Sequence, residues 1–219
     1  MSRYIVSDSK SGIKTLAVQS DGSSREIRLH SAYDPMKEAE RNLEGFTTGR
    51  GSFLIVSGIG LGYHISILKE RYPGMSVIAV ESDPEVTEIC RKLNPETLKG
   101  VHTVHDENDL PLLFDNIPMT GFTGVSHYIH KPSYQMNPSF YDNMISSIRQ
   151  NISSKVSDLL TRFEFEERWV RNILQNIRHM EDSLPVSSFF GKFRGYAGII
   201  VSAGPSLRRS LEQLKKLSG

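Results

Sequence analysis

The sequence predicts an α/β protein with a doubly wound, mostly parallel sheet, preceded by a small antiparallel β element and followed by a long helical arm. Two observations carry this prediction. Short apolar runs alternate with amphipathic segments over residues 53–129, which is the order of a sheet built from βαβ units. Apolar residues then recur at helical spacing over residues 156–184, which predicts a helix longer than the domain needs.

The stretch from Phe53 to Asp83 organises the rest of the chain. Its first apolar run, residues 53–57, is too short for a helix and contains β-branched residues. Three glycines follow: Gly58, Gly60 and Gly62. An amphipathic segment and a second apolar run, which ends at Glu81, complete the stretch. The order predicts a Rossmann-like βαβ unit whose two strands are parallel and buried on both faces.

The glycine turn predicts a candidate ligand site. Glycine supplies the positive φ or the missing Cβ that a strand needs to turn at once into a helix. The free N–H groups at the start of that helix favour a phosphate or a carboxylate. Glu81 is placed to accept hydrogen bonds from a ribose, and the G-x-G-x-G spacing resembles S-adenosylmethionine methyltransferases more than nicotinamide enzymes. A tight turn that binds no ligand is the alternative, because a lone glycine motif is a weak signal.

Composition narrows the class of protein. A chain of 219 residues is one domain with an appendage, or two small domains. The net charge of +1 gives no electrostatic reason to expect nucleic acid as the main partner. The sequence has no apolar run of membrane-spanning length and no signal-peptide apolar region near its start, so we expect no membrane association and a cytoplasmic location. Cys90 is the single cysteine and lies on an apolar helical face, which predicts a buried thiol.

The first fifty residues predict a small antiparallel sheet and a connector. Three β-prone runs, at residues 4–6, 15–18 and 26–29, are separated by turn-forming residues. A short helix over residues 36–43 follows, with Asp34 as N-cap and Pro35 at its first position. His30, Tyr33 and Asp34 could line a ligand cleft, but a connector satisfied by local hydrogen bonds is the favoured interpretation.

The region after Glu81 continues the alternating pattern. Helices are expected at 85–93 and 109–116, strands at 101–104 and 124–129, and a loop at 132–138. Four histidines in this region suggest a metal site: His102, His105, His127 and His130. We reject this hypothesis because His127 and His130 are three apart on a predicted strand and would face opposite sides of the sheet.

The sequence from Ser139 onward is almost purely helical. One helix opens at Ser139, and a seam of residues seven apart then runs to Pro185: Val156, Phe163, Val170, Ile177 and Leu184. An arm of about thirty residues would extend about 45 Å at 1.5 Å per residue. We expect its stripe to be buried on the domain or on a partner, so self-association through the arm is one alternative.

The last stretch of the chain repeats the pattern of a strand, a glycine turn and a helix. Residues 198–207 predict a strand, a glycine turn and the start of a helix whose apolar face is Leu207, Leu211 and Leu214. One strand and one helix cannot bury a core, so we expect the start of another domain here. We expect the chain to divide into four parts. Residues 1–50 form the β element and connector, 51–152 the Rossmann-like domain, 153–185 the helical arm, and 186–219 the start of the further domain.

An ordered series of short motifs resembles one known family. The motifs are Leu29-His30-Ser31-Ala32-Tyr33-Asp34-Pro35-Met36-Lys37-Glu38-Ala39, Gly58-Ile59-Gly60-Leu61-Gly62-Tyr63-His64, His130-Lys131-Pro132-Ser133-Tyr134 with Asn137-Pro138 and Phe140-Tyr141, Arg168-Trp169-Val170-Arg171-Asn172, and Ser202-Ala203-Gly204-Pro205-Ser206-Leu207. In this order they resemble the N-terminal domain and the first βα unit of the catalytic domain of the motility accessory factor (Maf) family. The series spans nearly the whole chain.

The resemblance implies a function and a second candidate site. Maf proteins are similar to sialyltransferases and are implicated in transferring CMP-activated nonulosonic sugars to flagellin Ser or Thr. By this resemblance, the nucleotide-sugar site would include Ser202, Ala203, Gly204, Pro205 and Ser206, and flagellin or a flagellin chaperone would be the partner. We expect residues 1–219 to be inactive by themselves. The alternatives are an S-adenosylmethionine methyltransferase using the first glycine turn and Glu81, and a non-catalytic interaction domain.

Overall fold

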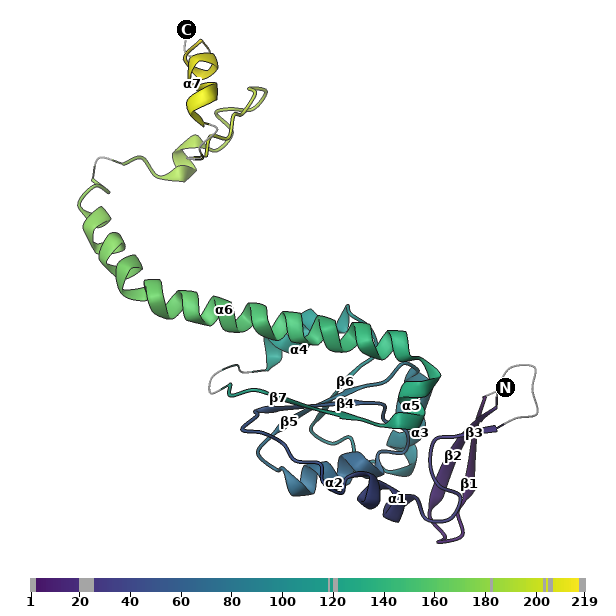
Figure 1. Ribbon diagram of the computed structural model, residues 1–219. Helices are drawn as coiled ribbons and strands as arrows, with labels where there is room; N and C mark the ends of the chain where they lie inside the picture. Colours follow the sequence, from purple (N-terminus) through teal and green to yellow (C-terminus); the bar gives the residue numbers. More distant parts are fainter. Residues whose placement is uncertain are drawn as a thin grey trace. The chain divides into compact units, whose positions relative to one another are not determined.

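A computed structural model describes residues 3–19, 26–117, 119, 122–181, 183–202, 204 and 207–216. The chain divides into two compact units, Met1–Phe163 and Glu164–Gly219. The first unit contains a parallel sheet with helices on both faces and a small second sheet (Figure 1). This division keeps the beginning of the expected arm, from residue 153 to residue 163, with the sheet domain.

The parallel sheet confirms the predicted α/β class. Its strands are β4 (Phe53–Ser57), β5 (Ser76–Val80), β6 (Val101–Val104) and β7 (Val125–Ile129), in the spatial order β6-β5-β4-β7. Every pair in it is parallel. All five residues of β4 are buried, as expected for an apolar run at the centre of a sheet that is covered on both faces.

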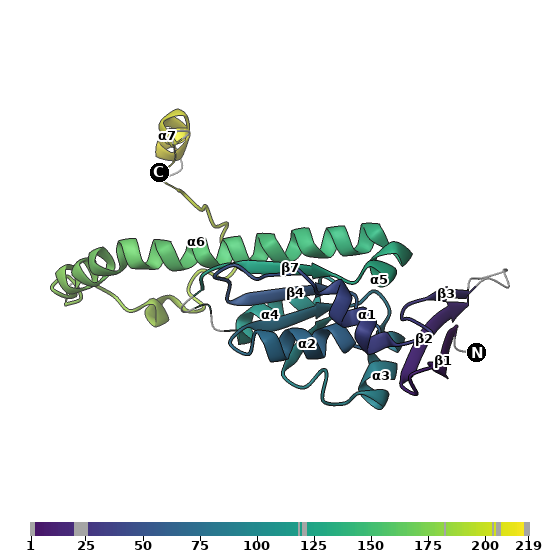
Figure 2. The same ribbon diagram turned by 60° about the horizontal axis from the view of Figure 1, so that its bottom comes forward.

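Helices cover the two faces of this sheet (Figure 2). On one face, α2 (Tyr63–Arg71) and α3 (Pro84–Leu93) pack on the side chains of Leu54 and Val56 through Leu68 and Cys90. On the other face, α4 (Asp109–Asn116) and α6 (Pro138–Ile177) cover Ile55 and Ile78. Alternate residues of β4 therefore enter opposite cores, and Cys90 is buried as predicted.

The predicted antiparallel sheet consists of β1 (Tyr4–Asp8), β2 (Lys14–Gln19) and β3 (Glu26–Arg28). It packs on α2 and α3 through a third core that includes Leu16, Leu61 and Val86. The connector leads into α1 (Pro35–Asn42), where the Asp34 side chain accepts a hydrogen bond from the N–H of Lys37, so the predicted N-cap is confirmed. Tyr33 is exposed, which agrees with a connector more than with a cleft.

The predicted loop at residues 132–138 is wrong, because Lys131–Met136 form the short helix α5. Pro132 lies within its first turn, where a proline removes no hydrogen bond. The N–H of Tyr134 donates to the carbonyl of His130 and closes that turn. His130 therefore follows β7 rather than belonging to it, which removes the reason we gave for its facing away from His127.

Helix α6 is a single 40-residue helix, although the sequence suggested separate segments. Its first half buries Tyr141, Met144, Ile145, Ile148 and Ile152 on the sheet. It ends at Ile177, before the predicted end at Pro185. Leu184 lies outside the helix and is exposed, so the last member of the predicted seam has no packing that would hold another helical turn in place.

The second unit begins within α6 and continues through a 3-10 turn, η1 (Val186–Phe189), to α7 (Leu207–Lys215). The predicted strand over residues 198–201 is wrong, because the chain is irregular there. Ile200 is 99% exposed, and no strand of this unit lies beside it among the described residues. An apolar run needs a neighbouring strand to satisfy its backbone groups, so it does not form a strand alone.

Candidate functional site

The first glycine turn joins β4 to α2 and has the backbone that the sequence predicted. Gly58, Gly60 and Gly62 have φ values of 92°, 51° and 77°, all in the region that favours glycine. The prediction that at least one of the three has positive φ is therefore confirmed. Gly62 is also the N-cap of α2 and provides no side-chain hydrogen bond there.

All three glycines are also in close contact with other parts of the chain, and a Cβ on Gly62 would lie 2.3 Å from Cγ2 of Thr97. A Cβ on Gly58 would lie 2.4 Å from Cβ of Ser133, and a Cβ on Gly60 would lie 2.4 Å from Nε2 of His30. All three distances are shorter than any van der Waals contact, so the neighbours would have to move. The space beside the turn is therefore filled by the connector, by α5 and by Thr97.

Three histidines form a buried stack against this turn, and we call them the histidine cluster: His30, His64 and His130. The rings of His64 and His130 are parallel within 6°, with centroids 4.5 Å apart. The centroids of His30 and His130 are 5.0 Å apart. All three side chains are buried. They come from the connector, from α2 and from the end of β7, so distant parts of the chain meet here.

Each ring of the histidine cluster is hydrogen-bonded within the protein. Nε2 of His30 accepts from the backbone N–H of Leu61 at 2.7 Å. Nε2 of His64 lies 2.9 Å from the carbonyl oxygen of Gly58, so that nitrogen donates. Nδ1 of His130 lies 2.8 Å from Oγ of Ser133.

Burial favours the neutral form of each ring in the cluster. It lowers the pKa of His30 to about 3 and that of His64 to about 4. The pKa of His130 is lowered well below its ordinary value, first by burial and then by the neighbouring His64 and His30. The cluster is therefore uncharged at neutral pH.

Glu81 lies at the end of β5, where the sequence predicted a ribose contact, but its carboxylate is bonded to the protein itself. Oε2 accepts from the N–H of Ile59 at 2.8 Å. Oε1 accepts from the Tyr141 hydroxyl and from the N–H of Ser82, each at 2.9 Å. Burial raises the pKa of Glu81, and the hydrogen bonds from the Ile59 N–H and the Tyr141 hydroxyl oppose the rise.

Four of the five N–H groups of the turn, residues 58–62, are likewise bonded within the chain. Bonded N–H groups belong to Gly58, Ile59, Leu61 and Gly62. Two of them bond backbone carbonyls, and the other two bond the side chains of Glu81 and His30. In a turn that cradles a phosphate such groups point at the ligand. In this chain the side chains of Glu81 and His30 accept those hydrogen bonds where a phosphate would otherwise do so.

The cluster lies at the topological switch point of the sheet. The strand order reverses at β4, which has β5 on one side and β7 on the other. In open α/β sheets, ligands bind at the carboxyl ends of the strands at this point. Gly58 follows β4 and His130 follows β7 directly. The position at which such a fold holds a nucleotide is thus packed with the chain's own histidines.

The second predicted site lies in the second unit. Ser202 and Gly204 are described, whereas Ala203, Pro205 and Ser206 lie outside the described residues. A cavity of about 390 Å³ is lined by Ser202, Gly204 and Leu207, together with Ile199–Val201, Ser210 and Leu214. Because the apolar run beside it is exposed, the cavity is an open groove rather than an enclosed pocket.

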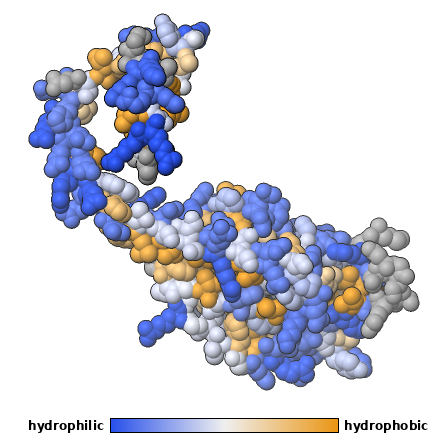
Figure 3. Space-filling model, turned by 45° about the horizontal axis from the view of Figure 1, so that its top comes forward, coloured by the Kyte–Doolittle hydropathy of each residue, from blue (hydrophilic) through white to orange (hydrophobic). Residues whose placement is uncertain are grey.

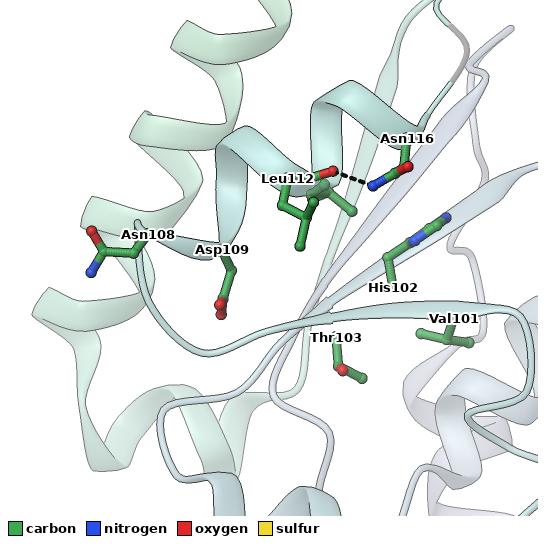
Figure 4. A pocket seen from close by; sticks show the side chains of 8 residues that line it. Val101, His102, Thr103, Asn108, Asp109, Leu112 and Asn116 are labelled. Atoms are coloured by element: carbon green, nitrogen blue, oxygen red, sulfur yellow. Dashed lines mark hydrogen bonds between the residues drawn. The ribbon is translucent and has the colours of Figure 1, made fainter.

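A further groove, which the sequence did not predict, lies where β6 forms an edge of the sheet beside α4 (Figure 4). It has a volume of about 400 Å³, with His102 on the strand side and Asn116 on the helix side. The amide of Asn116 donates to the carbonyl of Leu112, and the Asp109 carboxylate accepts from the N–H of His105. No sequence motif marks this groove, because it arises from the edge position of β6.

Two other features bear on metals and membranes. In the described part of the chain, no three His, Cys, Asp or Glu side chains are grouped so that they could hold a metal ion. His127 is bonded instead to the Ser57 hydroxyl at 2.9 Å.

None of the helices within the described ranges has both the length and the apolar character that crossing a membrane requires.

Comparison of the sequence with models of known protein families finds no match, and comparison with curated proteins finds none either.

Proposed function

We propose that this chain is the N-terminal part of a Maf-like flagellin glycosyltransferase, in which the Rossmann-like domain is a scaffold that folds without a bound nucleotide. The contact to the CMP-activated nonulosonic sugar belongs to the second glycine turn, at Ser202 and Gly204. The acceptor is a Ser or Thr of flagellin, presented by flagellin itself or by its chaperone. The proposal places the chain in the cytoplasm, which fits its single buried cysteine.

One observation carries the proposal: three motifs of the ordered series meet at a single point. His30 comes from the first motif, Gly58 and Gly60 from the second, and His130 and Ser133 from the third. They contact one another at the switch point. Residues that must fit together in one buried cluster are constrained together. This shared packing supports the interpretation that these three motifs form one structural unit.

The same geometry weighs against the methyltransferase alternative. The Glu81 carboxylate is buried and already accepts hydrogen bonds from the Tyr141 hydroxyl and the Ile59 N–H, so a ribose could reach it only if the groups that cover it moved. A nucleotide would also have to displace His30 from the glycine turn.

A non-catalytic interaction domain is the second candidate function, because the internally satisfied switch point also suits a domain that binds only protein. The two candidates differ in whether the second glycine turn contacts a nucleotide. CMP is therefore the ligand that separates them, and flagellin binding is common to both.

The experiment is isothermal titration calorimetry of the whole chain with flagellin, S-adenosylmethionine and CMP in separate runs. We expect saturable binding of flagellin, weak binding of CMP that Gly204→Val removes, and no heat from S-adenosylmethionine at micromolar concentrations. A saturable S-adenosylmethionine isotherm that Glu81→Ala abolishes would establish the methyltransferase instead. Flagellin binding without any CMP binding would favour the interaction domain.

A further inference from the structure

The second half of α6 carries an apolar stripe that is exposed and has no partner among the described residues. We call it the α6 stripe: Phe163, Val170, Ile173, Leu174 and Ile177. Its members are between 51% and 77% exposed. In the view of Figure 3, apolar surface shows near the base of the arm, whereas the rest of the arm is largely hydrophilic on this side. At 3.6 residues per turn these positions share one side of the helix, so the stripe is a continuous surface that water would disfavour.

Charged residues beside the stripe are arranged so that a second copy would complement them. Glu164 and Arg171 are seven residues apart, so they lie on the same flank of the stripe with opposite charge. In an antiparallel pair of identical helices, like flanks face each other. A twofold axis between residues 168 and 169 brings Glu164 of each helix beside Arg171 of the other and Phe163 beside Leu174.

The parallel arrangement is disfavoured by Glu167, which borders the stripe. In a parallel, in-register pair, Glu167 of one helix would face Glu167 of the other across the seam, and such like charges repel. In the antiparallel pair it lies beside Val170 instead. Its carboxylate is already paired with Arg171 of its own helix at 2.7 Å, so its charge is partly neutralised there.

We propose that the α6 stripe is covered by the α6 stripe of a second copy of this chain, in an antiparallel pair with twofold symmetry. Such an interface is isologous, so each favourable contact occurs twice. The proposal is independent of the proposed function, because it concerns only which surface covers the stripe.

Sedimentation equilibrium of the whole chain tests the pairing with three variants: Glu164→Arg, Arg171→Glu and the double exchange. Each single reversal turns two attractive contacts into repulsive ones, so we expect the dimer dissociation constant to rise roughly tenfold. The double exchange restores the attraction, so its dissociation constant should return to within a few-fold of the original. Arg168→Glu is the matched control, since it makes the same charge change on the opposite side of the helix.

Circular dichroism of each variant should show unchanged helix content, so that a loss of dimer is not a loss of folding. A chain that stays monomeric at 100 micromolar would overturn the proposal. A dimer that the single reversals leave unchanged would place the interface elsewhere. A dimer that the single reversals weaken but the double exchange does not restore would exclude the antiparallel arrangement. If the stripe instead binds flagellin, Val170→Asp would abolish flagellin binding while the chain remains monomeric.

Discussion

The backbone N–H of Leu61 donates a hydrogen bond to Nε2 of His30 across 2.7 Å. This bond joins the connector after β3 to the glycine turn after β4. A backbone N–H can only donate, so Nε2 of His30 must be unprotonated in the folded protein. The bond therefore makes the fold of the switch point dependent on the charge state of one histidine.

We expect the free energy of unfolding to fall as the pH is lowered from about 6.5 towards about 4. In the unfolded chain the three histidines bind protons near pH 6.5, whereas the pKa values of His30 and His64 in the folded protein are about 3 and 4. The unfolded state therefore binds more protons in this window, and each histidine removes about 1.4 kcal/mol per pH unit. The raised pKa of Glu81 acts in the opposite direction and offsets part of the loss.

Urea unfolding at pH 7.5, 6.5 and 5.5 measures this slope. His30→Gln should reduce it by about one proton, because Gln can still accept from Leu61 but does not titrate. His179→Gln, at an exposed position, is the control and should leave the slope unchanged. Equal free energies of unfolding at all three pH values would contradict the expectation.

Gly60→Val should destabilise the first unit whether or not a ligand binds. A β-branched residue at positive φ costs about 1–3 kcal/mol, and the contact with His30 adds an overpacking cost of similar size. Gly12→Val is the matched control, because Gly12 also has positive φ but nothing lies within 4 Å of its would-be Cβ. In thermal melts, Gly60→Val should lower the midpoint more than Gly12→Val does; equal shifts would mean that the contact with His30 does not matter.

Tyr141→Phe should lower the free energy of unfolding by about 1–3 kcal/mol, because it removes a buried hydrogen bond to the Glu81 carboxylate. Glu81→Gln should have a similar effect. The NH₂ group of the glutamine would lie beside N–H and O–H groups that also donate, so one of those hydrogen bonds would be lost. If the two side chains act through each other, the double variant costs less than the sum of the single variants. Additive effects in urea unfolding would show that they act separately.

Residues 1–219 should transfer no sugar from a CMP-activated nonulosonic donor to flagellin. Transfer requires a site that encloses the donor and holds the acceptor hydroxyl about 3–3.5 Å from the reacting carbon. The groove at Ser202 and Gly204 is open, and the apolar run beside it is exposed. Mass spectrometry of flagellin after incubation checks this expectation, and a mass gain that Gly204→Val removes would contradict it.

Local features of the sequence predicted most elements of the fold. The three strands of the antiparallel sheet, the Asp34 cap and the four strands of the parallel sheet are found close to their predicted ranges. Each of these elements is specified by residues only a few positions apart in the sequence, through apolar periodicity, turn residues or a helix cap. One error arose where distant contacts decide, because the apolar run at 198–201 has no neighbouring strand among the described residues. The other was local, because the N–H of Tyr134 bonds the carbonyl of His130 four residues earlier and closes the first turn of α5.

The sequence by itself determined the glycine turn, its positive φ values and the position of Glu81 at the end of β5. Only the tertiary structure decided what these groups contact. Glu81 meets Tyr141 sixty residues away, and His30 meets Leu61 thirty-one residues away. The physical reason is that the conformation of a backbone turn depends on local sterics. Which side chains occupy the switch point depends instead on the pairing of β7 with β4, which brings His130, Ser133 and α6 against the glycine turn.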